Sequence, residues 1–270
     1  MSIDPHAHNK TKESERLNAS LMASLDILDY LGSVRRGASL AELHRSLGLN
    51  KSRVIRLCGT LCLRGYLTYL EEEGAYTLGP RLMALGKVFE EGMSALAVIR
   101  PVLAEIEQEL GETVSFHVLR GKKRLCLCAV ESRQQVRYIM NEGSTGDAPF
   151  GSIWKVFMAY GPEDLLREIY DHAPYIPETP FSIVTREELE GAVRQTQAQG
   201  YFFSDSDHDV GSVGIAFPVF SAEGRLRGVL CLSGVTDRVK NMSFAEKALP
   251  LLKKQADRLG RLLEGIPLSV

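Results

Sequence analysis

The chain has 270 residues, of which 44% are hydrophobic and 24% are charged, and its formal net charge is -2. These values are those of an ordinary globular protein, and the length suits two domains that each bury a core. No apolar run approaches the roughly 18 residues of a membrane span, and the polar N-terminus lacks the apolar core of a secretory signal. We therefore expect a cytoplasmic protein with no membrane partner.

The chain contains five cysteines, an odd number, and no C-x-x-C pair. Each cysteine lies in an apolar helix or strand context, which favours reduced core thiols over disulfides or zinc ligands. We expect no metal and no cofactor. The cysteines are Cys58, Cys62, Cys126, Cys128 and Cys231.

Residues 1–16 are polar and are predicted to form a disordered arm. Apolar residues then recur at helical spacing over 17–31, which predicts a first helix that ends at Gly32. The arm carries three cations, whose simplest interpretation is that they are solvated.

Two short helices joined by a tight turn are predicted within residues 39–64. Ser39 and Glu42 match the S-x-x-E capping box that begins a helix, and Gly48 follows its last apolar position. Asn50 can cap a second helix, predicted over 51–64. A connection this short is typical of a helix-turn-helix.

The second of these helices is predicted to have one buried face and one basic face. The segment from Ser33 to Thr68 contains seven Lys or Arg and a single Glu. It is therefore strongly basic, although the whole chain is slightly acidic. Basic residues on the first turns of a recognition helix contact phosphates and base edges. The alternative is a face that is merely solvated. The predicted DNA contacts are Lys51, Ser52, Arg53 and Arg56, supported by Arg35 and Arg36.

A β-hairpin is predicted after this helix, with strands over 66–70 and 75–78, as in a winged helix. Its tip carries three consecutive glutamates at 71–73. Because acidic side chains are repelled by phosphates, we expect this wing to contribute little affinity or to point away from DNA.

Helices and strands predicted after the wing form a linker and a second domain. Apolar spacing predicts a linker helix from Pro80, and Pro101 is expected to open a separate helix that ends at Gly111. From Thr113 the apolar period changes to two, as in strands. We expect strands near 114–118, 125–129, 136–140, 201–203, 213–220 and 226–233, and helices near 153–160, 162–170, 185–200 and 243–264.

Two separate parts of the chain resemble the IclR-type bacterial transcription regulators. The segment from Ser39, SLAELHRSLGLNKSRVIRLCGTLCLRGYL, and the following YTLGPRLMALG are similar to the winged-helix signature of that family. ELGETVSFHVL, the Gly200-Tyr201 pair and FPVFSAEGRLRGVLCLSG are similar to its C-terminal domain. The resemblance covers about residues 17–263.

The resemblance implies an α+β protein with an N-terminal winged helix-turn-helix, a linker helix and a C-terminal GAF-like sensing domain with an antiparallel sheet. It implies a homodimer, or a dimer of dimers, on double-stranded operator DNA, as repressor or activator of catabolic genes. Its effector would be a small organic acid, including aromatic acids. The corresponding domains are 17–79, 80–98 and 99–270.

The resemblance also places an effector site. Where small-acid sensors of the family commonly have glycine this chain has Trp154, and Gly214 replaces a frequent cysteine. A pocket with few fixed donors and a nearby indole suits a larger, partly aromatic acid. The alternative is that Trp154 simply fills the core. The expected effector contacts are Ser152, Ile153, Trp154, Ser204, Asp205, Gly214, Cys231 and Ser233.

Other chemistry has weaker support in the sequence. The acidic run 205–209 contains suitable metal ligands, but a loop of this composition is more often solvated. No phosphate-binding glycine loop and no G-x-S-x-G occurs, so we expect no enzyme, and a hydrolase would have to use Cys231 with His117 or His208. A further alternative is a dimeric sensing protein that does not recognise DNA.

Overall fold

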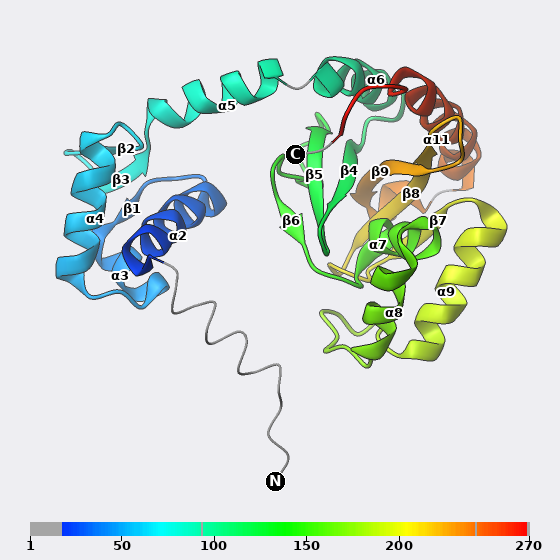
Figure 1. Ribbon diagram of the computed structural model, residues 1–270, viewed down its shortest axis with the longest axis horizontal. Coiled ribbons are helices and arrows are strands. Elements are labelled where there is room, and N and C mark those ends of the chain that lie inside the picture. Colours follow the sequence, from blue (N-terminus) through cyan, green and yellow to red (C-terminus); the bar gives the residue numbers. More distant parts are fainter. Residues whose placement is uncertain (1–17, 93, 241, 269–270) are drawn as a thin grey trace, which may run out of the picture. The chain divides into compact units, whose positions relative to one another are not determined.

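The computed structural model describes residues 18–92, 94–240 and 242–268. It divides into two compact units, Met1–Gly92 and Met93–Val270 (Figure 1). The arm expected at 1–16 lies outside the described residues. No helix among those described is both long enough and apolar enough to cross a bilayer.

Residues 18–78 of the N-terminal unit form three helices and a small antiparallel sheet. Strand β3 lies between β1 and β2, and all of its pairings are antiparallel. This is the winged helix-turn-helix expected from the sequence. The elements are α2 (Ala19–Val34), β1 (Ala38–Ser39), α3 (Leu40–Leu47), α4 (Lys51–Leu63), β2 (Leu67–Leu70) and β3 (Ala75–Leu78).

Side-chain caps fix where the two helices of the motif begin. Ser39 accepts a hydrogen bond from the Glu42 amide at 3.2 Å, and Asn50 accepts one from the Arg53 amide at 2.8 Å. Both caps were predicted. The reciprocal half of the Ser39 box does not form, because the Glu42 carboxylate binds Tyr30 and Arg36 instead. Each cap satisfies an amide that the helix leaves unpaired.

The first helix extends beyond the stop that the sequence predicts. It passes Gly32, continues to Val34 and ends at Arg35, which has a left-handed φ of 51°. Leu31 is buried there with Ile27, so packing in the core, rather than local propensity, decides the end of the helix. The core of this unit is Ile27, Leu31, Ala38, Leu43, Val54, Cys58 and Leu67.

Two helices, α5 (Pro80–Gly92) and α6 (Ser94–Leu110), follow the wing. The prediction that a helix opens at Pro101 is wrong, because α6 begins at Ser94 and Pro101 lies inside it. The apolar residues Leu96, Ile99 and Leu103 of α6 are buried, so their packing offsets the hydrogen bond that proline cannot donate.

The C-terminal unit is built on a six-stranded sheet of order β6-β5-β4-β9-β8-β7, in which every pairing is antiparallel. This agrees with the antiparallel sheet expected for the C-terminal domain. The strands are β4 (Thr113–Arg120), β5 (Lys123–Val130), β6 (Thr145–Gly146), β7 (Phe202–Asp205), β8 (Ser212–Phe220) and β9 (Leu226–Val235).

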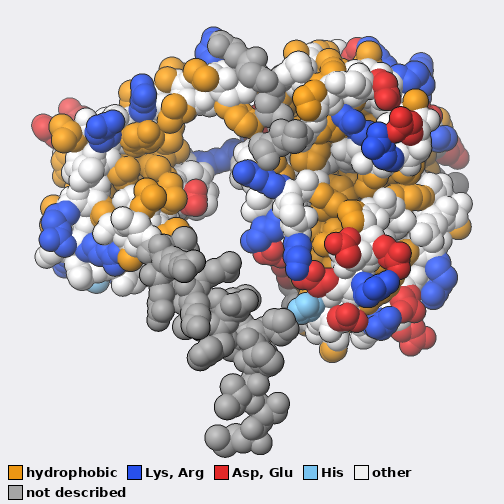
Figure 2. All heavy atoms as spheres, viewed as in Figure 1, with side chains coloured by type: hydrophobic (Ala, Val, Ile, Leu, Met, Phe, Trp, Pro, Cys, Tyr) orange, Lys and Arg blue, Asp and Glu red, His pale blue; other side chains and the backbone are white. Residues whose placement is uncertain are grey.

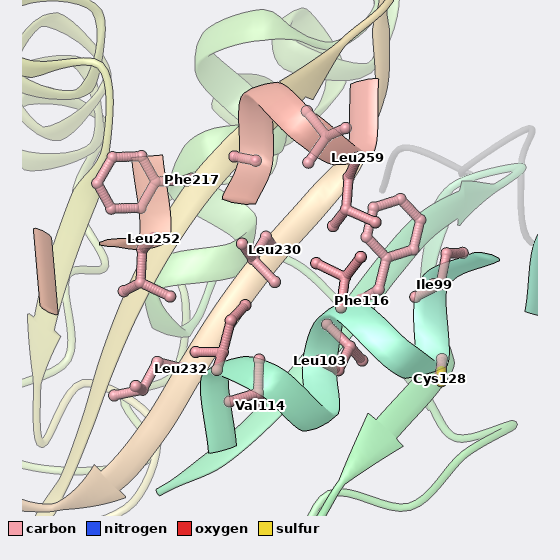
Figure 3. Packing of buried hydrophobic residues seen from close by; sticks show 14 of the residues in the cluster. Ile99, Leu103, Val114, Phe116, Cys128, Phe217, Leu230, Leu232, Leu252 and Leu259 are labelled. Atoms are coloured by element: carbon pink, nitrogen blue, oxygen red, sulfur yellow. The ribbon is translucent and has the colours of Figure 1, made fainter. Parts of the chain in front are cut away.

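Helices cover both faces of this sheet (Figure 1). One face packs against α6 and α11 (Met242–Leu262), and Figure 3 shows Leu103, Leu252 and Leu259 meeting Phe116 and Leu230 there. The other face packs against α7 (Gly151–Tyr160), α8 (Glu163–Asp171) and α9 (Arg186–Gln199). A short helix, α10 (Thr236–Val239), follows β9.

The strand predicted over 136–140 does not form. This segment has no regular structure, and its Tyr138 carbonyl accepts a hydrogen bond from the Thr113 side chain at 2.6 Å. The partner of β5 at this edge is instead the short strand β6, where Arg124 pairs with Gly146. Side-chain hydrogen bonds thus replace ladder bonds over 136–140.

Candidate functional site

The first turns of α4 present the basic face that the sequence predicts. Lys51, Ser52 and Arg56 are exposed, while Val54 and Cys58 on the opposite face are fully buried. Figure 2 shows Lys and Arg side chains gathered over α3 and α4 of the N-terminal unit. This arrangement can present cations to the phosphates and base edges of a groove.

Arg53 and Arg36 each donate hydrogen bonds within the unit. Arg53 donates from Nη2 to the Ala19 carbonyl at 2.6 Å, which ties α4 to the start of α2. Arg36 binds the Glu42 carboxylate through both terminal nitrogens, at 3.1 and 2.6 Å. By contrast, the guanidinium of Arg56 contacts no acceptor among the described residues.

A second polar site lies in the C-terminal unit, where the N-terminus of α7 meets β7, β8 and β9. The cavity there has a volume of about 40 Å³. We call this cavity the inner compartment, and its lining includes Ser152, Ile153, Ser204, Gly214, Cys231 and Ser233.

Hydroxyl groups converge in the inner compartment because Gly214 has no side chain. A Cβ at this position would lie 2.5 Å from Ser152 Oγ and 3.0 Å from Ser204 Oγ. Cys231 Sγ lies 3.6 Å from Ser152 Oγ and 3.5 Å from Ser233 Oγ. The compartment therefore offers several donors and acceptors around one small space.

The N-terminus of α7 adds backbone donors. The helix has no side-chain cap, and the Gly151 amide donates to Asp207 Oδ2 at 2.8 Å. No acceptor among the described residues is found for the amides of Ser152 and Ile153, which border the cavity. Free amides at a helix N-terminus favour an anion.

A buried ion pair fixes the loop that precedes α7. Lys155 Nζ lies 2.6 Å from Asp207 Oδ2 and also donates to the Pro149 carbonyl at 2.7 Å. Asp207 Oδ1 accepts from the Ile183 amide at 2.9 Å. Burial lowers the pKa of Lys155, and the neighbouring carboxylate opposes that change. The sequence pattern had suggested Asp207 only as a solvated or metal-binding side chain.

Six of the eight expected effector residues line the cavity, and Trp154 and Asp205 do not. Trp154 is fully buried with its ring 5.9 Å from that of Phe157, and its indole nitrogen has no partner within the described chain. Asp205 forms an ion pair with Lys240 and accepts a hydrogen bond from Thr236. The structure thus places Trp154 in the core rather than in the cavity wall.

The cavity also has walls that sequence reasoning missed. A neighbouring hollow of about 380 Å³, which we call the outer compartment, lies between β5, β6 and the segment 138–148. Five residues line both compartments: Arg124, Tyr138, Met140, Phe150 and His208. The two compartments are therefore adjoining parts of one site.

The acidic loop that could hold a metal is engaged in other contacts. His208 lies 2.9 Å from Asp209 and 3.5 Å from Glu178, and Asp209 accepts a hydrogen bond from Tyr138 at 3.0 Å. Among the described residues, no group of three His, Cys, Asp or Glu side chains is arranged for a metal ion.

Comparison with known protein families gives two matches. Residues 20–71 match the IclR helix-turn-helix domain, and residues 91–261 match the C-terminal domain of bacterial IclR transcriptional regulators. The HTH-type transcriptional regulator XynR of Escherichia coli is 27% identical over 84% of this chain and 90% of its own length. The transcriptional repressor IclR of the same organism is 23% identical over 87% and 86%.

Solved structures show the same fold. The IclR transcriptional regulator of Alicyclobacillus acidocaldarius has a TM-score of 0.75 at 23% identity, covering 90% of this chain and 98% of its own. An IclR homologue of Microbacterium hydrocarbonoxydans, solved with 4-hydroxybenzoate, has a TM-score of 0.74 at 20% identity, covering 91% and 99%. The family matches, which span both units, show that this chain belongs to the IclR family of DNA-binding bacterial transcriptional regulators.

Proposed function

We propose that this regulator senses a small organic acid in the cavity of its C-terminal unit and reads operator DNA with α4. The observation that carries the proposal is the N-terminus of α7, where the Ser152 hydroxyl and two amides with no acceptor among the described residues border the cavity. Backbone donors of this kind bind an oxygen atom of an acid, whether it belongs to the carboxylate or to a second polar group, without a charged side chain.

An aromatic acid is the effector class that the cavity favours. The inner compartment alone, at about 40 Å³, accepts little more than one polar group, whereas the outer compartment has room for a ring. Phe150 and Met140 supply apolar walls between them. The bound 4-hydroxybenzoate of the Microbacterium structure supports this choice.

On the DNA side, Lys51, Ser52 and Arg56 contact the operator directly. Arg53 joins them by releasing the Ala19 carbonyl, and Arg35 and Arg36 support them at the backbone of the DNA. A recognition helix reads only a few base pairs, so two protomers on a pseudo-palindromic site multiply specificity. The protein therefore acts as a homodimer, or as a dimer of dimers.

Effector binding changes DNA affinity only if the two arrangements of the protein differ in their affinity for the effector. The chain acts as a repressor, the role that the names of two relatives print for those proteins, and the genes it controls are catabolic. The acid is then the compound that those genes degrade, and its binding releases the operator.

The test is fluorescence anisotropy with the full chain and labelled DNA from upstream of its own gene, with and without 4-hydroxybenzoate. We expect sequence-specific binding at physiological salt and a lower affinity when the acid is present. If the protein bound its upstream DNA no better than scrambled DNA, the proposed operator recognition would be wrong. If the affinity for the operator were the same with and without each small acid tested, the proposed sensing role would be wrong.

A further inference from the structure

Arg124 joins the two compartments of the cavity. Its side chain lines both of them, and on β5 it lies two residues before Cys126. Side chains two residues apart on a strand leave the same face of the sheet, and Cys126 belongs to the cluster packed under α7. The guanidinium therefore reaches the site from the floor of the sheet.

Among the described residues, this arginine forms no ion pair with an acid. Its Nη1 lies 4.0 Å from Met140 Sδ, and within residues 18–92, 94–240 and 242–268 no carboxylate forms an ion pair with it. The acids at the outer compartment have other partners, since Glu178 contacts His208 at 3.5 Å and Asp147 contacts Lys123 at 3.2 Å. A partly buried cation without an anion is a costly arrangement unless a ligand supplies the charge.

Gly146 holds the guanidinium in position. It pairs with Arg124 across β5 and β6, and a Cβ at residue 146 would lie 2.6 Å from Arg124 Nε and 2.8 Å from Nη2. The planar group can lie against the strand only because residue 146 has no side chain. Gly146 is thus a positioning residue for Arg124.

The electrostatic field of the Arg124 guanidinium also extends into the inner compartment. Burial raises the pKa of the Cys231 thiol, and hydrogen bonds with Ser233 and Ser152, together with the charge of Arg124, oppose that increase. A field that acts on Cys231 also acts on an anion held between Ser152 and the outer compartment.

We propose that Arg124 binds the carboxylate of the effector and that the effector spans both compartments. This inference rests on the proposed acid-sensing function and makes it more specific. The effector is an acid whose carboxylate is separated, by a ring or a carbon chain, from a second hydrogen-bonding group that the Ser152 and Ser204 hydroxyls hold. The guanidinium fork matches a carboxylate with two parallel hydrogen bonds.

Isothermal titration calorimetry of the full chain with 4-hydroxybenzoate, benzoate and 4-hydroxybenzamide tests the proposal. We expect 4-hydroxybenzoate to bind, benzoate to bind more weakly because it lacks the inner hydroxyl, and the neutral amide to bind weakest. Arg124→Gln should weaken 4-hydroxybenzoate binding by roughly tenfold to 100-fold, the range for loss of a charge-assisted hydrogen bond.

Three further variants separate binding from folding. Arg120→Gln makes the same charge change at an exposed position on the adjoining strand β4, and it should leave the Kd unchanged. Gly146→Ala should displace the Arg124 guanidinium and, like Arg124→Gln, weaken the binding of 4-hydroxybenzoate. Arg124→Lys should restore part of the affinity, and a melting curve of each variant checks that it folds.

Different results would overturn the proposal of acid sensing and the proposal that Arg124 binds the carboxylate. If Arg124→Gln binds 4-hydroxybenzoate as tightly as the wild type, the carboxylate lies elsewhere and this inference is overturned, while acid sensing stands. If the acid and the amide bind the wild type equally, Arg124 does not recognise a carboxylate. If neither 4-hydroxybenzoate nor the linear diacid adipate binds the wild type at millimolar concentration, both proposals are overturned.

Discussion

The two units present their cations in opposite ways. In the N-terminal unit, Lys51 and Arg56 stand exposed on one face of α4, where salt screens them and each contributes modestly. In the C-terminal unit, Arg124 is partly buried in a cavity, and no acid among the described residues forms an ion pair with it. Exposed cations suit a long anionic surface, and a single enclosed one suits a single small anion. On the proposals made above, the same side-chain chemistry serves two ligands of different size.

The contrast between the two units depends on a rigid cavity in the C-terminal unit. The largest change in the free energy of unfolding is expected when the buried ion pair beside this cavity is broken. Asp207→Asn would leave Lys155, whose side chain is 0% exposed, without a counter-charge. We expect a loss of about 3–5 kcal/mol in the free energy of unfolding, the usual cost of an uncompensated buried charge. Urea unfolding measures it, with the exposed Asp164→Asn on α8 as control. Equal midpoints for both variants would contradict the assignment.

The exposed face of α4 can be tested one cation at a time. Arg56→Ala should weaken operator binding by about 1–3 kcal/mol if the arginine reads a base edge. Lys51→Ala should weaken specific and non-specific DNA alike and reduce the salt slope by about one. Anisotropy titrations at several salt concentrations distinguish the two, with the exposed Arg64→Ala at the other end of α4 as control. If the Arg56→Ala variant bound the operator like the parent protein, Arg56 would not be a DNA contact.

The presentation of that face depends on the start of α4. Asn50→Ala removes the cap on the Arg53 amide and should lower the free energy of unfolding by about 1 kcal/mol. Asn50→Asp keeps the acceptor and should be nearly neutral. Thermal unfolding of the three proteins checks the difference. A stable Asn50→Ala variant would mean that packing alone sets the start of the helix.

The smallest effect is expected at the acidic tip of the wing. Glu71, Glu72 and Glu73 are exposed, and replacing Glu72 with Gln removes one charge that phosphate would repel. We expect operator affinity to stay the same or to rise by a few tenths of a kcal/mol. A clear loss of affinity would show that the wing makes a contact that needs the acid.

The features that sequence predicted best are those fixed by neighbouring residues. The caps at Ser39 and Asn50, and the strands of the wing, depend on side chains a few positions away. The position of Trp154 was harder to predict, because side chains of successive residues on a helix point about 100° apart. Ile153 therefore lines the cavity while Trp154 enters the core.

Long-range pairing explains what the sequence did not predict. Arg124 reaches the cavity because β5 pairs with β6, an edge strand of two residues that no periodic pattern marks. Likewise, Asp207 meets Lys155 across 52 positions of the chain. Contacts of this kind depend on register and loop path, which alternating apolar residues do not specify.

The location of Gly146 has a consequence for how such sensors diverge. Strand β6 lies at the edge of the sheet, so a substitution there alters the cavity without disturbing the strands on which the domain folds. If Arg124 binds the effector as we propose, a single exchange at position 146 would move its guanidinium and change the length and charge of the preferred effector. Selection can therefore retarget the regulator to a new compound while the operator that it reads stays the same.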